Sequence, residues 1–143
     1  MNRAIQITYF LLRVVSGFLF FEAGAAIVLG WFGGMPSGGQ RPSLTSQIGI
    51  GGILELVGGL AIMFGLCTRP IAFIASGEMA VAYWQFHAPR ALWPAQNQGI
   101  PAILFCFIFL FMAAYGPGDW SLDALLKRKR EAALKDAAVT KSQ

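Results

Sequence analysis

The sequence has little charge for its length, and it has few of the side chains that metal and catalytic sites need. Charged residues make up 13% of its 143 residues, and hydrophobic residues make up 56%. Soluble domains carry about 25% charged residues, so this is the composition of a membrane protein. The one histidine, His87, cannot form a metal site by itself, and we interpret it as an interfacial side chain near a helix end.

Cofactor motifs are also missing. Cys67 and Cys106 form neither a CxxC pair nor a metal-ligand pattern, and we interpret them as small apolar residues. The sequence contains no phosphate-binding glycine loop, nucleophile elbow, CxxCH or HExxH. Six of the eleven Lys and Arg residues follow residue 126, so they do not form the basic face of a nucleic-acid-binding protein. We therefore predict no metal, no cofactor and no nucleic-acid partner.

Four long apolar segments are present, at residues 4–29, 47–66, 70–88 and 99–116. Each supplies the roughly 20 helical residues that cross about 30 Å of hydrocarbon. Nothing alternates with the period of two that barrel strands show. The sequence therefore predicts an all-α fold, a four-helix transmembrane bundle over residues 1–120, followed by a tail at 121–143.

Basic residues predict the orientation of this bundle. Both termini and the 67–70 connection share one side, which holds eight Lys and Arg residues, whereas the two outer loops hold two. The positive-inside rule then places both termini in the cytoplasm. Ser121 can cap a helix in the tail, where leucines lie on one stripe, and we expect a basic amphipathic helix lying on the anionic inner surface.

Four charged residues fall inside the predicted spans, namely Arg13, Glu22, Glu55 and Glu78. Charges in hydrocarbon are costly, so they normally face protein, pair with each other, or mark a pathway. We count about 1.5 Å per residue from the cytoplasmic end of each span. This count places Glu22 roughly 27 Å deep and the other three at about 12–16 Å.

The position of Glu55 in "GGILELVGGL" indicates which way it points. It lies on the same helical stripe as Gly51 and Gly58, and glycine stripes let membrane helices approach closely. We therefore predict that Arg13, Glu55 and Glu78 meet inside the bundle, where one arginine can bond two carboxylates. Two interpretations stay open: an ion-pair network that fixes helix register, and a proton-coupled or ligand-binding cluster.

Several stretches resemble the DoxX family of small four-helix membrane proteins. They are "LLRVVSGFLFFEAG", "GWFGG", "GILELVGGLAIMFGLCTRPIAF", "GEMAVAYW" and "GPGDWSLD", which together span about residues 11–123. The resemblance implies a multi-pass protein of the bacterial cytoplasmic (inner) membrane. It also implies an association with redox chemistry, because relatives include a subunit linked to thiosulfate:quinone oxidoreduction. Another relative assembles with superoxide dismutase and a thiol oxidoreductase.

The chain departs from the family pattern on the outer side. A Gln-His-Gly-x-x-Lys pattern often follows the first phenylalanine run, but here Ala23 and Ile27 stand at the His and Lys positions. The family's Asn-Gly-Gly-Glu before the fourth helix is "NQGI", with Ile100 at the acidic position. Polar groups are thus replaced by apolar ones, which favours a structural over a catalytic role.

Three hypotheses for function follow. The first is a non-catalytic accessory subunit of a larger membrane redox or energy-converting complex, with lipids and that complex, or other copies of the chain, as partners. Phe105, Phe107, Phe109 and Phe111 support it, because they cannot share one helical face and so favour packing against lipid or another subunit over a quinone slot. The second is the membrane subunit of a quinone-linked (thiosulfate or thiol) oxidoreductase, which would use a quinone. The third is a small transporter.

Overall fold

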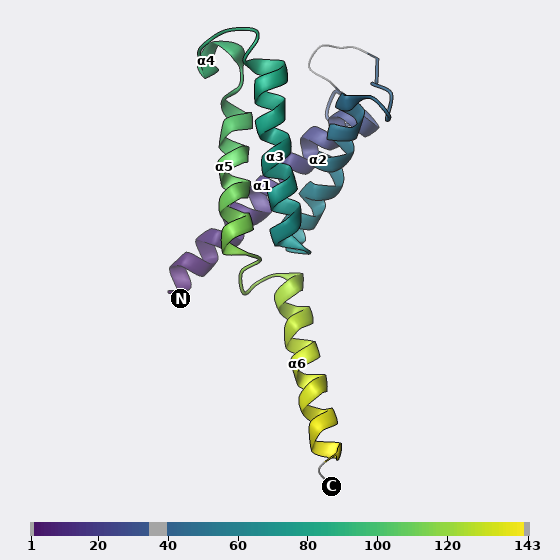
Figure 1. Ribbon diagram of the computed structural model, residues 1–143, viewed down its shortest axis with the longest axis vertical. Helices are drawn as coiled ribbons and strands as arrows, with labels where there is room; N and C mark the ends of the chain where they lie inside the picture. The colour runs from purple at the N-terminus through teal and green to yellow at the C-terminus, as the bar shows by residue number, and fades with distance from the viewer. Residues whose placement is uncertain (1, 35–39, 142–143) are drawn as a thin grey trace.

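The computed structural model describes residues 2–34 and 40–141, with side chains up to residue 138. Within these ranges the chain is helical and has no strand, which confirms the predicted all-α class (Figure 1). Part of the predicted first loop, 35–39, and the end of the predicted tail, 142–143, lie outside the described residues. The helices are α1 (Arg3–Leu29), α2 (Gln47–Phe64), α3 (Thr68–Ala82), the π-helical turn η1 (Tyr83–His87), α4 (Pro94–Asn97), α5 (Ile100–Tyr115) and α6 (Leu122–Lys141).

Each predicted span corresponds to a helix with similar limits. The spans expected at 4–29, 47–66 and 99–116 are α1, α2 and α5, and the span expected at 70–88 is α3 continued by η1. By length and composition, α1 and α2 can each cross a membrane, and α5 is a shorter apolar helix. That all four helices cross the membrane, with both termini in the cytoplasm, stays a prediction.

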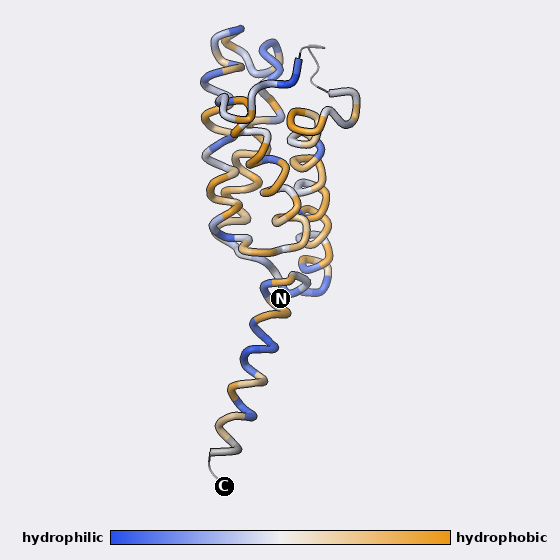
Figure 2. The backbone as a smooth tube through the Cα atoms, turned by 90° about the vertical axis from the view of Figure 1, so that its right-hand side faces the viewer, coloured by the Kyte–Doolittle hydropathy of each residue, from blue (hydrophilic) through white to orange (hydrophobic). Residues whose placement is uncertain are grey.

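The bundle consists of two helix pairs. One pair is α1 with α2, the other is α3 with α5, and contacts between α2 and α3 join them. Figure 1 shows α1 running obliquely relative to α3 and α5. Figure 2 shows a mainly hydrophobic bundle, with hydrophilic residues gathered near its ends and along α6.

Glycines bring α1 and α2 into backbone contact. A Cβ added at Gly17 would lie 2.6 Å from the Met63 nitrogen and 2.9 Å from the Gly59 oxygen. A Cβ added at Gly24 would lie 2.6 Å from the Gly52 oxygen. Ordinary contacts between carbon atoms are about 3.5–4.0 Å long, so only glycine allows this approach. Gly52 and Gly59 of α2 therefore contact α1, whereas Gly51, which the sequence placed on the stripe of Glu55, faces Glu78 of α3.

The core lies between the two pairs, where Phe20, Ile62, Phe109 and Met112 are fully buried. The phenylalanines of α5 do not share a face, as predicted: Phe109 is in this core, whereas Phe107 is 65% exposed. The outward sides of the four bundle helices therefore remain apolar and uncovered.

Capping groups define several helix limits. The Ser46 hydroxyl accepts a hydrogen bond from the Gly49 nitrogen (3.1 Å) at the start of α2. Gly65 ends α2 with a φ of 70°, a left-handed conformation that glycine adopts without strain. The predicted cap by Ser121 is present, because its hydroxyl accepts from the Ala124 nitrogen (3.1 Å) at the start of α6.

The predicted basic tail helix is α6, but it does not fold across the end of the bundle. Figures 1 and 2 show it continuing away from that end, and residues 125–138 are exposed. The basic residues 127–130 are consecutive, so they point about 100° apart and surround the helix. Because charge lies on every side, α6 has no broad apolar face with which to lie flat on a surface.

Candidate functional site

Two of the three predicted charges come together between α2 and α3. A Cβ added at Gly51, one turn before Glu55 on α2, would lie 3.1 Å from Oε1 of Glu78 on α3. Glu55 lies one helical turn after Gly51, so it is on the side of α2 that faces Glu78. In each, Oε2 is buried and has no hydrogen-bond partner among the described residues. Glu55 and Glu78 are therefore a pair of carboxyl groups inside the bundle.

A groove of about 210 Å³ opens beside Glu78 between α2 and α3. Its other lining residues are glycine or apolar, namely Ile53, Leu54, Val57, Gly58, Ile71, Ile74 and Ala75. None of these side chains can donate a hydrogen bond to a carboxylate. The side chains that line the groove therefore offer the glutamate pair no hydrogen-bond donor.

Arg13 does not join the glutamates. It is 1% exposed, and its guanidinium donates from Nη1 to the Ile62 oxygen (3.4 Å) and from Nη2 to the Trp120 oxygen (2.5 Å). Its Nε is buried and has no hydrogen-bond partner among the described residues. Since Ile62 is seven residues after Glu55 on α2, the arginine lies about 10 Å further along that helix. The structure thus separates the expected three-charge layer into an arginine site and a glutamate pair.

The separation arises because α1 starts beyond the end of α2. The Gln6 amide donates to Oδ2 of Asp119 (2.5 Å), and the Tyr9 hydroxyl donates to the Gly116 oxygen, so both residues contact the loop that follows α5. Arg13, one turn after Tyr9, consequently reaches the last turn of α2. Depth counted from the cytoplasmic end of each predicted span assumed a common level that these helix ends do not share.

Asp123 in the first turn of α6 and Arg69 at the start of α3 tie this end of the bundle together, a role that sequence reasoning missed. The Asp123 carboxylate accepts from the Cys67 nitrogen (2.9 Å) and the Thr68 nitrogen (3.0 Å), and so caps α3. Arg69 donates to the last carbonyls of α5, at Ala113 (3.1 Å), Ala114 (2.7 Å) and Tyr115 (3.1 Å). No local pattern signals this cap, because Asp123 lies 55 residues after Thr68 in the sequence.

The opposite end is built around Asn97, which is 1% exposed. Its side chain donates to the Ala91 oxygen (2.9 Å) and accepts from the Gly99 nitrogen (2.8 Å). Nδ1 of His87 lies 3.0 Å from the Asn97 carbonyl oxygen, and the ring stacks on Tyr83. His87, the last residue of η1, therefore helps to fix the connection between η1 and α4.

The remaining candidate groups are the two cysteines and Glu22, and Sγ of Cys106 lies 3.6 Å from Oγ of Ser76. The described part of the chain contains no group of three or more His, Cys, Asp or Glu residues that could hold a metal ion. Cys67 and Cys106 are both free thiols. Glu22, which the sequence placed apart from the other charges, is half-buried on α1.

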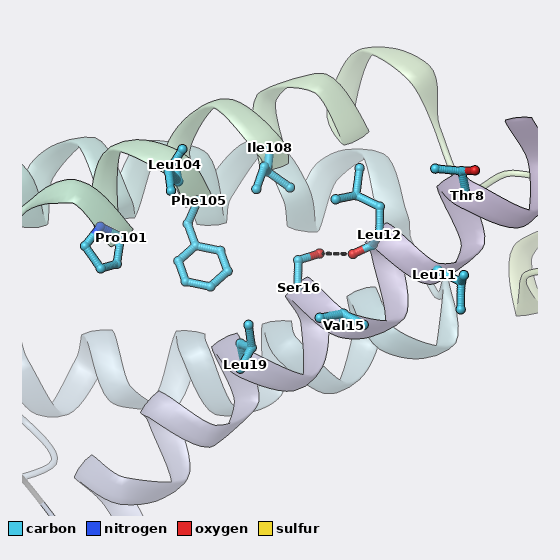
Figure 3. A pocket seen from close by; sticks show the side chains of 10 residues that line it. All are labelled: Thr8, Leu11, Leu12, Val15, Ser16, Leu19, Pro101, Leu104, Phe105 and Ile108. Atoms are coloured by element: carbon cyan, nitrogen blue, oxygen red, sulfur yellow. Dashed lines mark hydrogen bonds between the residues drawn. The ribbon is translucent and has the colours of Figure 1, made fainter.

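A larger feature is a cleft of about 580 Å³ between α1 and α5 (Figure 3). Figure 3 shows the two helices diverging from Leu12 and Ile108 towards Leu19 and Pro101. The only polar side chains on its walls are Ser16 and Thr8, whose hydroxyls donate to the Leu12 oxygen (2.6 Å) and the Ala4 oxygen (2.9 Å). The other lining residues are Leu11, Leu12, Val15, Leu19, Pro101, Leu104, Phe105 and Ile108.

Comparison with known proteins gives a family and two relatives. The DoxX family model matches residues 8–88, more than half of the chain. The chain is 35% identical over 120 residues to a Haemophilus influenzae protein described as uncharacterized, covering 80% of this chain and 89% of that protein. It is 29% identical over 130 residues to the inner membrane protein YqjF of Escherichia coli, covering 82% and 90%. No solved structure matches the chain.

Proposed function

This chain belongs to the DoxX family, and on that premise we propose that it is a multi-pass inner-membrane protein with both termini in the cytoplasm. Its function is that of a non-catalytic accessory subunit, which packs within the membrane against a larger redox or energy-converting complex. The cleft between α1 and α5 is the observation that carries this proposal.

The cleft suits a neighbouring transmembrane helix. Its walls diverge, so apolar side chains on each wall lack the dispersion contacts that a closed bundle would give them. Side chains of a partner helix can fill such a wedge, as happens between packed membrane helices. The exposed side chains of Val15 (54%) and Leu104 (57%), one on each wall, would contact that helix first.

The chemistry of the walls favours a helix over a cofactor. Binding sites for small molecules combine an apolar pocket with a few converging polar groups that orient the ligand. In this cleft the hydroxyl protons of Ser16 and Thr8 are already donated to carbonyls of α1 itself. No free donor converges on the cleft from the described residues that line it.

The test is gentle detergent extraction of the tagged chain from native membranes. Co-migrating proteins are separated on a native gel and identified by mass spectrometry, and an absorption spectrum is recorded. We expect stoichiometric migration with a pigment- or haem-bearing complex and no chromophore in the isolated chain. Migration alone, or as a homo-oligomer only, would contradict the proposal.

Matched variants tie this result to the cleft. Val15→Trp and Leu104→Trp each place an indole in the cleft and should abolish co-migration while the isolated chain melts as before. Phe73→Trp is the control, because Phe73 is 65% exposed on α3 and does not line the cleft. Equal behaviour of all three variants would show that the partner binds elsewhere.

A second candidate function is the membrane subunit of a quinone-linked oxidoreductase. The observation in its favour is the glutamate pair, because ionisable residues within membrane spans often mark proton pathways, and each of these two keeps a buried oxygen without a partner. Glu55→Gln and Glu78→Gln should then reduce quinone-dependent oxygen consumption of membrane vesicles without lowering expression. Glu22→Gln is the matched control, and no loss from the first two variants would exclude this candidate.

A further inference from the structure

α6 carries a ring of positive charge close to the bundle. Lys127, Arg128, Lys129 and Arg130 are consecutive and exposed. Since an α-helix turns about 100° per residue, these four side chains point in four directions around α6. We call residues 127–130 the basic collar.

Polarity changes along α6, not across it. Leu122, Leu125 and Leu126, in its first turns, are 40%, 48% and 56% exposed, and the preceding Trp120 is 47% exposed. The collar follows them directly. At about 1.5 Å per residue, it lies roughly 7–12 Å beyond Leu122 along the helix axis. A helix that lies flat on a membrane would instead separate its apolar and basic residues onto opposite faces.

The first turn of α6 is attached to the bundle. The Asp123 nitrogen donates to the Gly65 oxygen (3.0 Å) at the end of α2. The Asp123 carboxylate also accepts from the Cys67 and Thr68 nitrogens at the start of α3. These bonds fix where α6 begins, and Figures 1 and 2 show it leaving the bundle from that point.

We propose that the basic collar binds the phosphate groups of anionic phospholipids in the inner leaflet, with α6 upright, and so sets the depth of the bundle. This rests on the proposed membrane placement, with α6 on the cytoplasmic side. The headgroup layer on each side of a bilayer is about 5–8 Å thick. The leucines then reach the acyl chains, while the flexible lysine and arginine side chains of the collar reach the headgroups.

The ring shape favours lipid over an acidic protein. A protein surface covers one side of an isolated helix, and it would leave part of the collar unmatched. Headgroups surround an upright helix, so all four charges find phosphates at the same level. Anionic membranes attract each such basic residue by about 1 kcal/mol, which corresponds to a factor of roughly five in affinity.

The experiment uses the purified full-length chain in lipid nanodiscs with equal amounts of phosphatidylglycerol and phosphatidylcholine. Retained lipids are counted by native mass spectrometry for wild type, Lys127→Gln/Arg128→Gln and the control Lys135→Gln/Lys141→Gln. Both variants lose two charges from α6, and glutamine keeps a similar helix propensity. The control residues lie about 12 Å or more beyond Lys127 along the axis.

We expect the collar variant to lose about tenfold or more of its preference for phosphatidylglycerol, and the control to change less than twofold. Equal losses would show a general charge effect and overturn the proposal. An unchanged preference for phosphatidylglycerol in the collar variant would also overturn the proposal. The collar would then face water or an acidic protein. Complex membership is measured in native membranes, so this experiment and the test of the accessory role can fail independently.

Upright orientation has its own readout. A spin label at Leu134→Cys, in a background of Cys67→Ser and Cys106→Ala, reports its contact with a water-soluble nickel reagent and with oxygen. An upright α6 holds this label in water, where collisions with the nickel reagent relax the spin label more strongly than collisions with oxygen do. Stronger relaxation by oxygen would show that α6 lies in the membrane surface. The collar would then not form a ring among the headgroups, and the proposal would fail.

Discussion

Gly59→Ala should separate α1 from α2. The added methyl carbon would lie 2.6 Å from Cα of Phe21 and 2.7 Å from the Gly17 oxygen, and both contacts are with backbone. Carbon atoms normally touch at about 3.5–4.0 Å, so the two helices must move apart by about 1 Å. A gap of this size forfeits roughly a quarter to a half of each dispersion contact along the seam.

The net cost follows from two opposing effects. Overpacking of a close contact costs about 1–3 kcal/mol, and the backbone clash favours the upper part of this range. Alanine gains about 1 kcal/mol over glycine in helix propensity. We expect the free energy of unfolding to fall by about 2 kcal/mol. The measurement is reversible unfolding in mixed detergent micelles, followed by circular dichroism.

Gly77→Ala is the matched control. Gly77 is an exposed helical glycine on α3, and a Cβ added there meets no atom within 4 Å. The same chemical change should leave stability unchanged or raise it by up to about 1 kcal/mol. The two variants should therefore differ by about 2–3 kcal/mol. If they lose stability equally, or if Gly59→Ala is the more stable, the backbone seam between α1 and α2 is not present in the protein.

Two further predictions concern the polar contacts at the end of the bundle. Arg13→Lys keeps the charge, but the lysine cannot reach both carbonyls. The loss of one charge-assisted hydrogen bond should lower the free energy of unfolding by about 2 kcal/mol in the same assay. Unchanged stability would show that the bonds to Ile62 and Trp120 are absent. Asp123→Ala removes the cap of α3 and should lower the free energy of unfolding by about 1 kcal/mol. It should also speed the alkylation of the exposed Cys67. An unchanged alkylation rate would argue that the cap does not order this turn.

Much of the secondary structure could be predicted from the sequence, because its causes are local. The hydrocarbon thickness sets the length of an apolar segment, and the 65–70 stretch contains the glycine and proline that separate two helices. The glycine face of α2 was readable for the same reason, since its spacing follows the helical period.

The relative level of the helices could not be predicted, because contacts between distant parts of the chain set it. Tyr9 contacts Gly116 and Arg13 contacts Trp120, and each pair is 107 residues apart in sequence. No periodicity in one segment records such an offset. The cleft was not predictable for a related reason, since it depends on how far α1 and α5 diverge. The sequence therefore placed three charges in one layer, where the structure holds only two.

Helix ends contribute to the stability of Arg13 and of two other charges at the same end of the bundle. The last carbonyls of a helix carry partial negative charge, and its first N–H groups carry partial positive charge. Arg13 binds near the end of α2, Arg69 binds the end of α5, and Asp123 binds the start of α3, so each charge has a helix terminus of opposite sign. Glu55 and Glu78 lie within their helices, and each keeps a buried oxygen without a partner, whereas Arg13, whose Nε is also unpartnered, has both terminal nitrogens bonded to carbonyls. Packing and capping account for the charges at this end of the bundle but not for the glutamate pair, which makes that pair the place to test for proton chemistry.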